Sequence, residues 1–269
     1  MLHLRKDILL FPDGKKKAFT FSFDDGVSQD IRFIELLRKY HIKSTFNLNS
    51  NSQNKKKELS KLYAGFEVAV HGKTHAHLRT IPTPMLTYEI LENKKELETL
   101  TKHPIQGMAY PFGEFSPEIE QVATCCGIVY GRTAHSTHEF FLPENFMHWN
   151  PTCHYADTSL SALTKQFLSP LENSAYNHPL LLSIWGHTYE FDENGHWQYI
   201  EDFCQYIGDR KEIWYASNIE IYEYIQASKT LVYSTTGNYI YNPSRIDIWM
   251  MINEKEYCIK SGQTIHIDG

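Results

Sequence analysis

The chain has 269 residues and a formal net charge of −6, with 42% hydrophobic and 22% charged residues. This length and composition predict a globular protein with a large core, built as one big domain or as one domain with a small appendage. The negative net charge gives no sign of a basic surface, which argues against nucleic acid as the main partner. The aromatic content of 14% also suits a cleft that stacks on sugars.

The N-terminal sequence MLHLRKDILLFPDGKKK contains no apolar stretch long enough for a signal-peptide core. No membrane-spanning run follows it. The five cysteines, two of which are the neighbours Cys125 and Cys126, do not resemble a disulfide framework. We therefore expect a cytoplasmic protein, with a secreted form as the alternative if a leader has been removed.

Short apolar strands alternate with helical patterns along most of the chain. In the first strand Phe19, Phe21 and Phe23 lie on one face at period two, opposite Thr20 and Ser22. The predicted strands cover residues 18–23, 43–47, 66–70, 107–110, 128–132, 147–151, 180–185 and 213–216.

Three helices have recognisable start signals. The segment TPMLTYEILENKKELETL begins with Thr83 as a predicted cap and a proline at the first helical position, and SPEIEQVATCCG repeats the pattern from Ser116. In NIEIYEYIQAS the predicted cap is Asn218. Strands and helices that alternate in this way indicate a parallel sheet, and seven or eight such units indicate a barrel. We assign residues 1–227 to this barrel and residues 228–269, which have short β-like runs and no helix signal, to a small β extension.

The two adjacent carboxylates that end the first strand need an explanation. Asp24 and Asp25 repel each other unless one of them meets a cation or holds a proton. Downstream, HGKTHAH ends another strand with His71 and His75 four residues apart, a spacing that can place both imidazoles on one side. Two imidazoles and one carboxylate form a common catalytic metal site. The alternative is a loop of surface histidines.

Polar residues follow five of the predicted strands at the same end. They are Asp24 and Asp25, His71, the segment AYPFGEF, Arg132, and WGHTYEFD with His187. In parallel barrels, functional residues lie just beyond the carboxyl ends of the strands. This regular placement therefore favours one shared site over chance loops.

The motifs TFSFDDG, HGKTH, YPFG and LLLSIWGH, in this order, resemble those of the polysaccharide deacetylase family, which is carbohydrate esterase family 4 or the NodB homology domain. The resemblance covers roughly residues 18–225. It implies a distorted (β/α)7 TIM-like barrel and a hydrolase that removes N- or O-acetyl groups from a sugar or polysaccharide with one divalent metal ion. Zinc is the favoured ion, and this ligand set also accepts cobalt, nickel or manganese.

The resemblance also implies a role for individual residues. Asp25, His71 and His75 would bind the metal. Asp24 would be the general base that takes a proton from water, the backbone N–H of Phe112 would stabilise the oxyanion, and His187 would be the general acid. Side chains that could line a sugar subsite are Tyr110, Pro111, Trp149 and Trp185.

Two positions depart from the family pattern. Ala109 stands where many members carry an arginine that pairs with the base, and Arg132 could supply that charge instead. His148 precedes Trp149 where many members carry an aspartate that orients the catalytic histidine, and Asp157 or Glu190 could serve in its place.

Two other functions remain open at this stage. A metal-dependent amidohydrolase would act on a small non-sugar amide in a closed pocket, sealed by the β extension or a neighbouring subunit. A non-catalytic carbohydrate-binding barrel would have kept the fold and lost turnover. The oligomeric state is not determined by the sequence.

Overall fold

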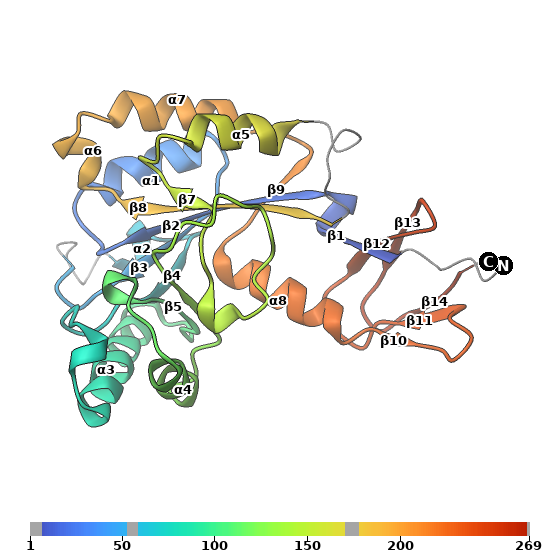
Figure 1. Ribbon diagram of the computed structural model, residues 1–269, viewed down its shortest axis with the longest axis horizontal. Helices are drawn as coiled ribbons and strands as arrows, with labels where there is room; N and C mark the ends of the chain where they lie inside the picture. The colour runs from blue at the N-terminus through green and yellow to red at the C-terminus, as the bar shows by residue number, and fades with distance from the viewer. Residues whose placement is uncertain (1–6, 53–58, 170–177, 268–269) are drawn as a thin grey trace.

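The computed structural model describes residues 7–52, 59–169 and 178–267, and its core is a curved sheet of parallel strands (Figure 1). The strands run in the order β6-β5-β4-β3-β2-β8-β7, and every pair along this path is parallel. The predicted distorted barrel is therefore confirmed, in an incompletely closed form. The bounds are Lys17–Asp24 (β2), Ser44–Leu48 (β3), Glu67–Val70 (β4), Gly107–Ala109 (β5), Tyr130–Arg132 (β6), Cys153–His154 (β7) and Leu180–His187 (β8).

The central strand β2 is apolar on the face that meets the helices. The Phe21 ring lies 5.6 Å from Phe33 and 5.9 Å from Phe203, between ring centroids. Phe23 contacts Phe33 at 4.6 Å in the same cluster. Along its length β2 pairs with β8, while β3 and the short β9 (Ile213–Tyr215) share its other edge. Burial of this aromatic face fixes which side of β2 looks into the barrel.

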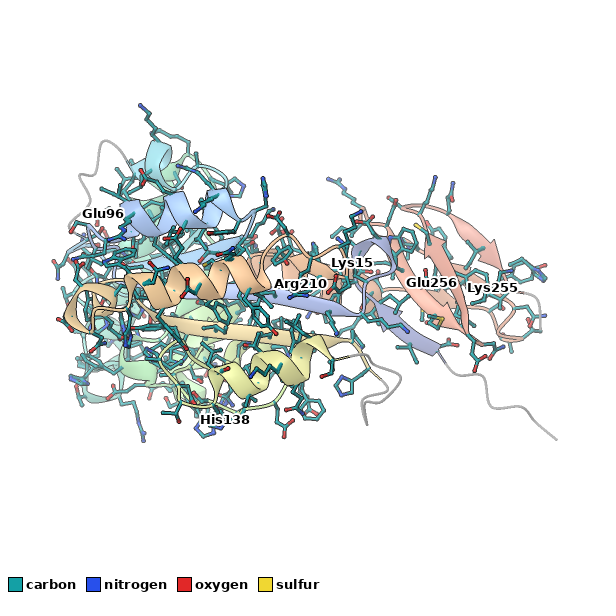
Figure 2. The ribbon with its side chains drawn as sticks, turned by 90° about the horizontal axis from the view of Figure 1, so that it is seen from above. Lys15, Glu96, His138, Arg210, Lys255 and Glu256 are labelled. Atoms are coloured by element: carbon teal, nitrogen blue, oxygen red, sulfur yellow. The ribbon has the colours of Figure 1, made fainter. Side chains whose placement is uncertain are left out.

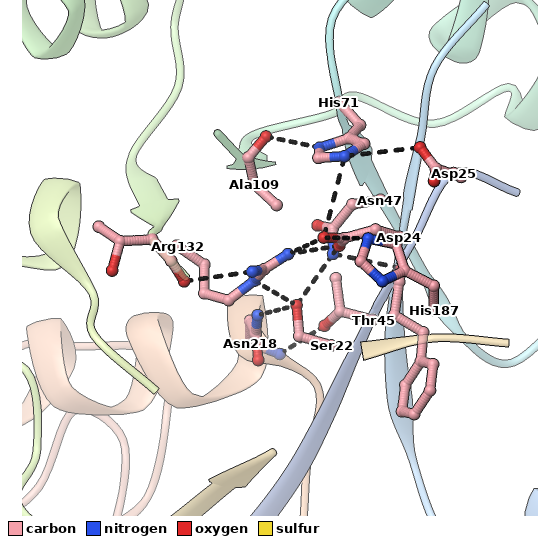
Figure 3. Close-up of polar contacts among 12 residues, drawn as sticks. Ser22, Asp24, Asp25, Thr45, Asn47, His71, Ala109, Arg132, His187 and Asn218 are labelled. Atoms are coloured by element: carbon pink, nitrogen blue, oxygen red, sulfur yellow. Dashed lines mark hydrogen bonds and ion pairs between the residues drawn. The ribbon is translucent and has the colours of Figure 1, made fainter. Parts of the chain in front are cut away.

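The opposite face of β2 is polar and lines the barrel interior. Ser22 Oγ accepts hydrogen bonds from Asn47 Nδ2 at 2.9 Å, Arg132 Nε at 3.2 Å and Asn218 Nδ2 at 3.3 Å. Thr20 Oγ1 donates to Asn218 Oδ1 at 2.9 Å. The alternation seen in the sequence therefore continues into a hydrogen-bonded interior that leads along β2 to Asp24 (Figure 3).

Helices cover the outside of the sheet (Figure 1). Within the described ranges, no helix has both the length and the apolar character that a bilayer crossing requires. The helices are Asp30–Lys39 (α1), Leu59–Leu62 (α2), Thr83–Thr101 (α3), Pro117–Cys125 (α4), Leu160–Leu168 (α5), Glu190–Glu193 (α6), Trp197–Ile207 (α7) and Asn218–Lys229 (α8).

One of the three predicted caps is confirmed and two are wrong. Ser116 Oγ accepts a hydrogen bond from the backbone N–H of Ile119 at 3.2 Å and caps α4. Helix α3 is preceded by Pro82, because Thr83 is already helical and its hydroxyl donates to Glu118 Oε1 at 2.5 Å.

Helix α8 begins after Ser217 rather than after the predicted cap. The backbone N–H of Ser217 donates to Glu220 Oε2 at 2.8 Å in a capping box. Asn218 cannot act as the cap, because its amide group is already used by Thr20 and Ser22 inside the barrel.

The predicted strand at 147–151 is wrong. The segment forms a 3-10 turn, Phe146–His148, which Asn145 caps by accepting a hydrogen bond from Met147 N at 2.9 Å. A single parallel bridge then joins Trp149 to Arg132, and the regular strand of this unit forms later, as β7. Pro151 has no N–H to donate, which favours this displacement of the strand.

The small β extension packs at the end of the barrel where β2 begins, and it projects away from the helices (Figures 1 and 2). It consists of two three-stranded antiparallel sheets, β1-β12-β13 and β10-β11-β14. The N-terminal strand β1, which the sequence analysis groups with the barrel, pairs here with β12. The bounds are Asp7–Leu10 (β1), Val232–Tyr233 (β10), Tyr239–Tyr241 (β11), Ile248–Ile252 (β12), Lys255–Ile259 (β13) and Thr264–His266 (β14).

A tyrosine of α8 joins the barrel to the extension. Tyr224 OH donates to the backbone oxygen of Leu10 at 2.6 Å and accepts from Trp249 N at 3.0 Å. Tyr224 is 1% exposed, and it belongs to a hydrophobic cluster that includes Ile240 and Ile248 of the extension. The extension is thus fixed to the barrel end that lies opposite the carboxyl ends of the strands.

Candidate active site

The carboxyl ends of the parallel strands bring the predicted polar residues together. Asp24 ends β2, Arg132 ends β6 and His187 ends β8, while His71 directly follows β4. Figure 3 shows that their side chains converge on one point. The polar residues at the ends of the predicted strands therefore indicated this cluster.

Asp25, His71 and His75 form a compact group. Their ligand atoms lie within 4.8 Å of one another. His71 Nε2 is 3.7 Å from Asp25 Oδ1 and 3.1 Å from His75 Nε2, and the distance from His75 Nε2 to Asp25 Oδ1 is 3.8 Å. These three residues are the predicted metal ligands, and the fold places their donor atoms face to face.

The chemistry of this donor set fits a divalent cation. His71 Nδ1 lies 2.9 Å from the carbonyl oxygen of Ala109, which can only accept a hydrogen bond, so Nδ1 carries the proton. Burial lowers the pKa of His71, although the charges of Asp24 and Asp25 oppose this effect. The neutral ring therefore directs the lone pair of Nε2 toward Asp25 and His75. Imidazole lone pairs and a carboxylate that are directed at one place form a donor set that binds a divalent cation.

The backbone around these ligands is strained. Asp25 has φ = 76° and His75 has φ = 58°, both in the left-handed region that non-glycine residues rarely adopt. Asn49 Nδ2 donates to Asp25 Oδ1 at 3.0 Å and helps hold that carboxylate in place. Strain of this kind persists where surrounding contacts determine the conformation, and it clusters at functional sites.

Asp24 is 3% exposed and is paired with Arg132. The guanidinium NH2 group donates to both carboxylate oxygens, and its distance to Oδ2 is 2.5 Å. Asn47 Nδ2 also donates to Oδ1, at 2.9 Å. Burial raises the pKa of Asp24, but the charges of Arg132, His71 and His187 outweigh burial, so the pKa lies below its ordinary value. Asp24 is therefore an ionised carboxylate in a buried position.

His187 faces the same carboxylate from the opposite side. Its Nε2 lies 4.0 Å from Asp24 Oδ2, and its Nδ1 is hydrogen-bonded to Glu190 Oε1 at 2.7 Å. Burial lowers the pKa of His187, but the hydrogen bond with Glu190 and the charges of Asp24 and Asp25 raise it above its ordinary value.

Of the two acids expected near His187, only Glu190 reaches it. Asp157 Oδ2 instead pairs with His138 Nε2 at 2.8 Å, on a loop at the side of the barrel (Figure 2). Asp157 therefore does not orient His187, in contrast to one of the two expectations from the sequence.

Phe112 lies next to His75, one of the proposed metal ligands. It has φ = 57°, its ring is 53% exposed, and the ring stacks on His77 with centroids 3.8 Å apart. The centroid of His75 lies 4.5 Å away. The backbone of Phe112 is thus held at the edge of the site, next to one of the three ligands.

Tyr110 and Trp149 are core residues and cannot stack on a sugar, so this expectation from the sequence is wrong. Each is 1% exposed. Tyr110 crosses Gly131, where an added Cβ would lie 2.3 Å from the Tyr110 hydroxyl, and that hydroxyl donates to Met147 O at 2.8 Å. Pro111 is also buried, whereas Trp185 is half-buried beside the Arg132 guanidinium, 5.0 Å from the ring centroid.

Sequence reasoning missed two asparagines of the site. Asn47, in β3, contacts Asp24, and Asn49, directly after β3, contacts Asp25. The sequence does indicate their place in the site, because the segment FNLNS puts both asparagines at the carboxyl end of the second predicted strand.

Comparisons with known proteins give a family match and several structures of similar fold. Residues 12–131 match the family model described as polysaccharide deacetylase. The crystal structure of Puue allantoinase is 13% identical and has a TM-score of 0.61, covering 78% of this chain and 90% of its own. A CE4 family pseudoenzyme from Bacillus anthracis is 17% identical with a TM-score of 0.51, covering 80% of this chain and 67% of its own.

A third similar structure is the Xyl-CE4 domain of a multidomain xylanase from the hindgut metagenome of Trinervitermes trinervoides. It is 16% identical with a TM-score of 0.51, covering 79% of this chain and 92% of its own. At such identities these likenesses show the fold. No curated protein matches the sequence.

Proposed function

Residues 12–131 belong to the polysaccharide deacetylase family, and from this premise we propose that the chain is a metal-dependent hydrolase that removes acetyl groups from a sugar or polysaccharide. The observation that carries the proposal is the convergence of Asp25, His71 and His75 beside the ionised Asp24 and the hydrogen-bonded His187.

Asp25, His71 and His75 would hold one divalent ion, for which zinc suits two imidazoles and one carboxylate. When bound, such an ion polarises a carbonyl group and makes water a better nucleophile at neutral pH.

Asp24 serves as the general base in this proposal. Its Oδ2 faces both His71 Nε2, at 3.8 Å, and His187 Nε2, at 4.0 Å. Arg132 donates to both oxygens, and Oδ1 also accepts from Asn47, so Oδ2 has the fewer hydrogen bonds. Oδ2 is therefore the atom that takes the proton from the attacking water. The pairing with Arg132 keeps Asp24 ionised and ready to accept that proton.

His187 serves as the general acid. Its Nδ1 is occupied by Glu190, so Nε2 is the nitrogen that delivers a proton to the departing amine or alcohol. The backbone N–H of Phe112 would donate to the oxyanion of the tetrahedral intermediate, and the Phe112 ring lies 4.5 Å from the ring of His75, between centroids.

The two alternative functions have less support. The pocket of a small-amide hydrolase could have been sealed by the β extension, but the extension lies at the other end of the barrel (Figure 1). One similar structure is a pseudoenzyme, and a mutant of that protein has restored activity. A binding-only barrel would leave the grouping of Asp24, Asp25, His71, His75 and His187 without a purpose.

The test is acetate release by the zinc-reconstituted protein. The substrate panel is chitin oligomers, peptidoglycan fragments, acetylated xylan and free N-acetylglucosamine. Chelation of the metal should abolish acetate release, and Asp24→Asn should lower it by about 10²–10⁴-fold while the metal stays bound. Absence of acetate from every substrate, with zinc bound stoichiometrically, would refute the proposed function.

A further inference from the structure

A cavity of about 460 Å³ lies at the amino ends of β3, β4 and β5, at the opposite end of these strands from the candidate active site. Its walls come from the segment that leads into β4, from the turn between α3 and β5, and from the start of α8. Small-molecule sites are typically cavities of about 300–1,000 Å³ with apolar walls and a few polar groups. No step of the proposed mechanism uses this cavity.

One wall of the cavity is apolar and belongs to the packed interior. Tyr63 is 3% exposed and Ile105 is 4% exposed, and both are part of the main hydrophobic cluster. This wall would cover the hydrocarbon part of a ligand and remove it from water. Its side chains are Leu59, Tyr63, Phe66, Val68, Ile105 and Ile219.

The half-buried Glu67, the first residue of β4, supplies a carboxylate to the same cavity. Donors from three other elements hold it in place. Tyr130 OH of β6 donates to Oε1 at 2.7 Å, and Thr45 Oγ1 of β3 and the backbone N–H of Ile219 of α8 donate to Oε2 at 2.7 and 2.9 Å. A carboxylate has about four acceptor sites, so within the described chain Oε1 keeps one for a further donor.

The charges around the cavity favour a positive ligand. Lys43 lines the cavity, but it is paired with Glu220, so its charge is already matched. Among the residues that the structure describes, no basic side chain is paired with Glu67 or with Glu223, which stands exposed at the rim. The three donors to Glu67 are neutral, and burial raises its pKa to about 7. A carboxylate in this state is stabilised by a cation beside it.

We propose that this cavity binds a small organic ammonium ion, with the ammonium group on Glu67 and the hydrocarbon part against the apolar wall. An ammonium group brings a positive charge and three N–H donors, which match the carboxylate and its remaining acceptor site. A metal ion would need several oxygen ligands where this cavity has an apolar wall. An anion would be repelled by Glu67 and Glu223. The site is separate from the proposed deacetylase chemistry and does not depend on it.

The test is a titration of the zinc-reconstituted protein with n-butylammonium chloride at a pH of about 8, above the pKa of Glu67. Isotope-labelled isoleucine methyl groups are followed by NMR, because Ile105 and Ile219 line the cavity. Their signals are assigned with Ile105→Val and Ile219→Val. Both signals should shift and saturate, with a dissociation constant on the order of 1 mM. An amine that bound only to the zinc ion would leave both signals in place and would overturn the proposal.

Two further probes separate charge from hydrocarbon. The neutral 1-butanol has the same chain and should bind at least about 10-fold more weakly, because it lacks a hydrogen bond between charged groups. Butyrate should not shift the two signals. Equal affinity for 1-butanol would assign the cavity to uncharged apolar ligands, and tighter binding of butyrate would assign it to anions held by Lys43. Either result would overturn the proposal.

Variants test the role of the carboxylate. Glu67→Gln keeps the size of the side chain, and it should weaken butylammonium binding by about 10–100-fold. The matched control is Glu144→Gln, an exposed acid outside the cavity wall, which should bind as the wild type does. Equal losses in the two variants would assign the binding to general surface charge and overturn the proposal.

A second variant leaves Glu67 intact. Ala64 is exposed and lines the cavity, so the indole of Ala64→Trp should fill the space and abolish binding. Urea unfolding confirms that this variant is folded. Full affinity in the folded variant would place the ligand elsewhere and overturn the proposal. Because the readout is a methyl signal and not acetate, these results stand whether or not the protein is a deacetylase.

Discussion

Arg132 donates to both carboxylate oxygens of Asp24 from β6, the strand next to the one where the family pattern places an arginine. Ala109, which occupies the family position, is the direct register partner of Arg132 across the β5–β6 pair. Directly paired residues of parallel strands point to the same face, so both side chains face the barrel interior. Arg132 therefore supplies from β6 the positive charge that the family pattern places on β5, and it contacts Asp24.

Loss of Arg132 should lower the stability of the folded protein. Arg132→Met leaves Asp24 as an uncompensated buried charge, and we expect the free energy of unfolding to fall by about 3–5 kcal/mol. Urea unfolding measures the change. The control is Arg210→Met, whose surface pair with Glu212 at 3.6 Å should contribute about 0–1 kcal/mol. Equal losses in the two variants would contradict a buried ion pair.

A double variant tests whether an arginine at position 109 on β5 can replace Arg132 on β6. Ala109→Arg, introduced together with Arg132→Ala, places the guanidinium in the space that Arg132 vacates. We expect this double variant to recover part of the stability that Arg132→Ala loses, because the same carboxylate is again compensated. A double variant that is less stable than Arg132→Ala alone would show that the two positions are not equivalent.

Metal binding should depend on Asp25 and His71 but not on His77. Asp25→Ala and His71→Ala each remove a ligand, and we expect zinc affinity to fall more than about 100-fold, since loss of an outer partner alone costs about 10–100-fold. Equilibrium dialysis with metal analysis measures this. His77→Ala is the matched control from the same loop, because His77 is exposed and pairs with Glu114 at 3.0 Å. Full zinc content in His71→Ala would refute the ligand assignment.

The role of His187 should depend on the leaving group. In His187→Ala, hydrolysis of an N-acetyl sugar should fall by about 10²–10⁴-fold, because the departing amine needs a proton. Hydrolysis of p-nitrophenyl acetate should change little, because its leaving group departs without one. Steady-state rates on the two substrates give the comparison. A similar loss on both would contradict general acid catalysis by His187.

Stability should fall with rising pH because of a half-buried acid at the other end of the barrel. Tyr130 OH donates to Glu67 Oε1 at 2.7 Å, and Thr45 Oγ1 and Ile219 N donate to Oε2 at 2.7 and 2.9 Å. Burial nevertheless raises the pKa of Glu67 from 4.5 to about 7. Between these values the folded chain holds a proton that the unfolded chain has released, so this contribution is fully present below the lower pKa and disappears as pH rises through the upper one.

The variant Glu67→Gln tests this assignment. Glu67 contributes a slope of up to about 1.4 kcal/mol per pH unit to the free energy of unfolding in this window. Glu67→Gln should remove the slope, while the exposed Glu144→Gln should leave it in place. Urea unfolding at several pH values is the measurement. An identical slope in wild type and Glu67→Gln would show that Glu67 does not cause it.

The parts of the fold that were predicted correctly have local causes. The alternation of Phe19, Phe21 and Phe23 marks a strand with one face under helices, and the order of strands and helices fixes a parallel sheet. Since parallel strands share one end, the polar residues at their ends were expected together, and the structure places them so. Glu190, one of the two candidates, lies three residues from His187, and this short separation brings the two side chains together.

The remaining features depend on contacts between distant parts of the chain. The pairing of β1 with β12 joins segments more than 230 residues apart, and nothing near Asp7–Leu10 signals it. Burial of Tyr110 and Trp149 was missed because both faces of a barrel strand are covered, so a tyrosine or tryptophan gives no sign of which face is accessible. The contact between Arg132 and Asp24 depends on the order of the five strands from β6 to β2, which local patterns do not specify.

The position of the extension has a practical consequence. Both ends of the described chain, at β1 and β14, lie at the end of the barrel opposite the carboxyl ends of β2 and β8 (Figure 1), where Asp24 and His187 stand. A tag at either terminus therefore attaches the protein to a support through the side that carries the β extension. Protein immobilised on a resin through such a tag should present its reactive face outward, toward a suspended polymer particle, whichever terminus is used.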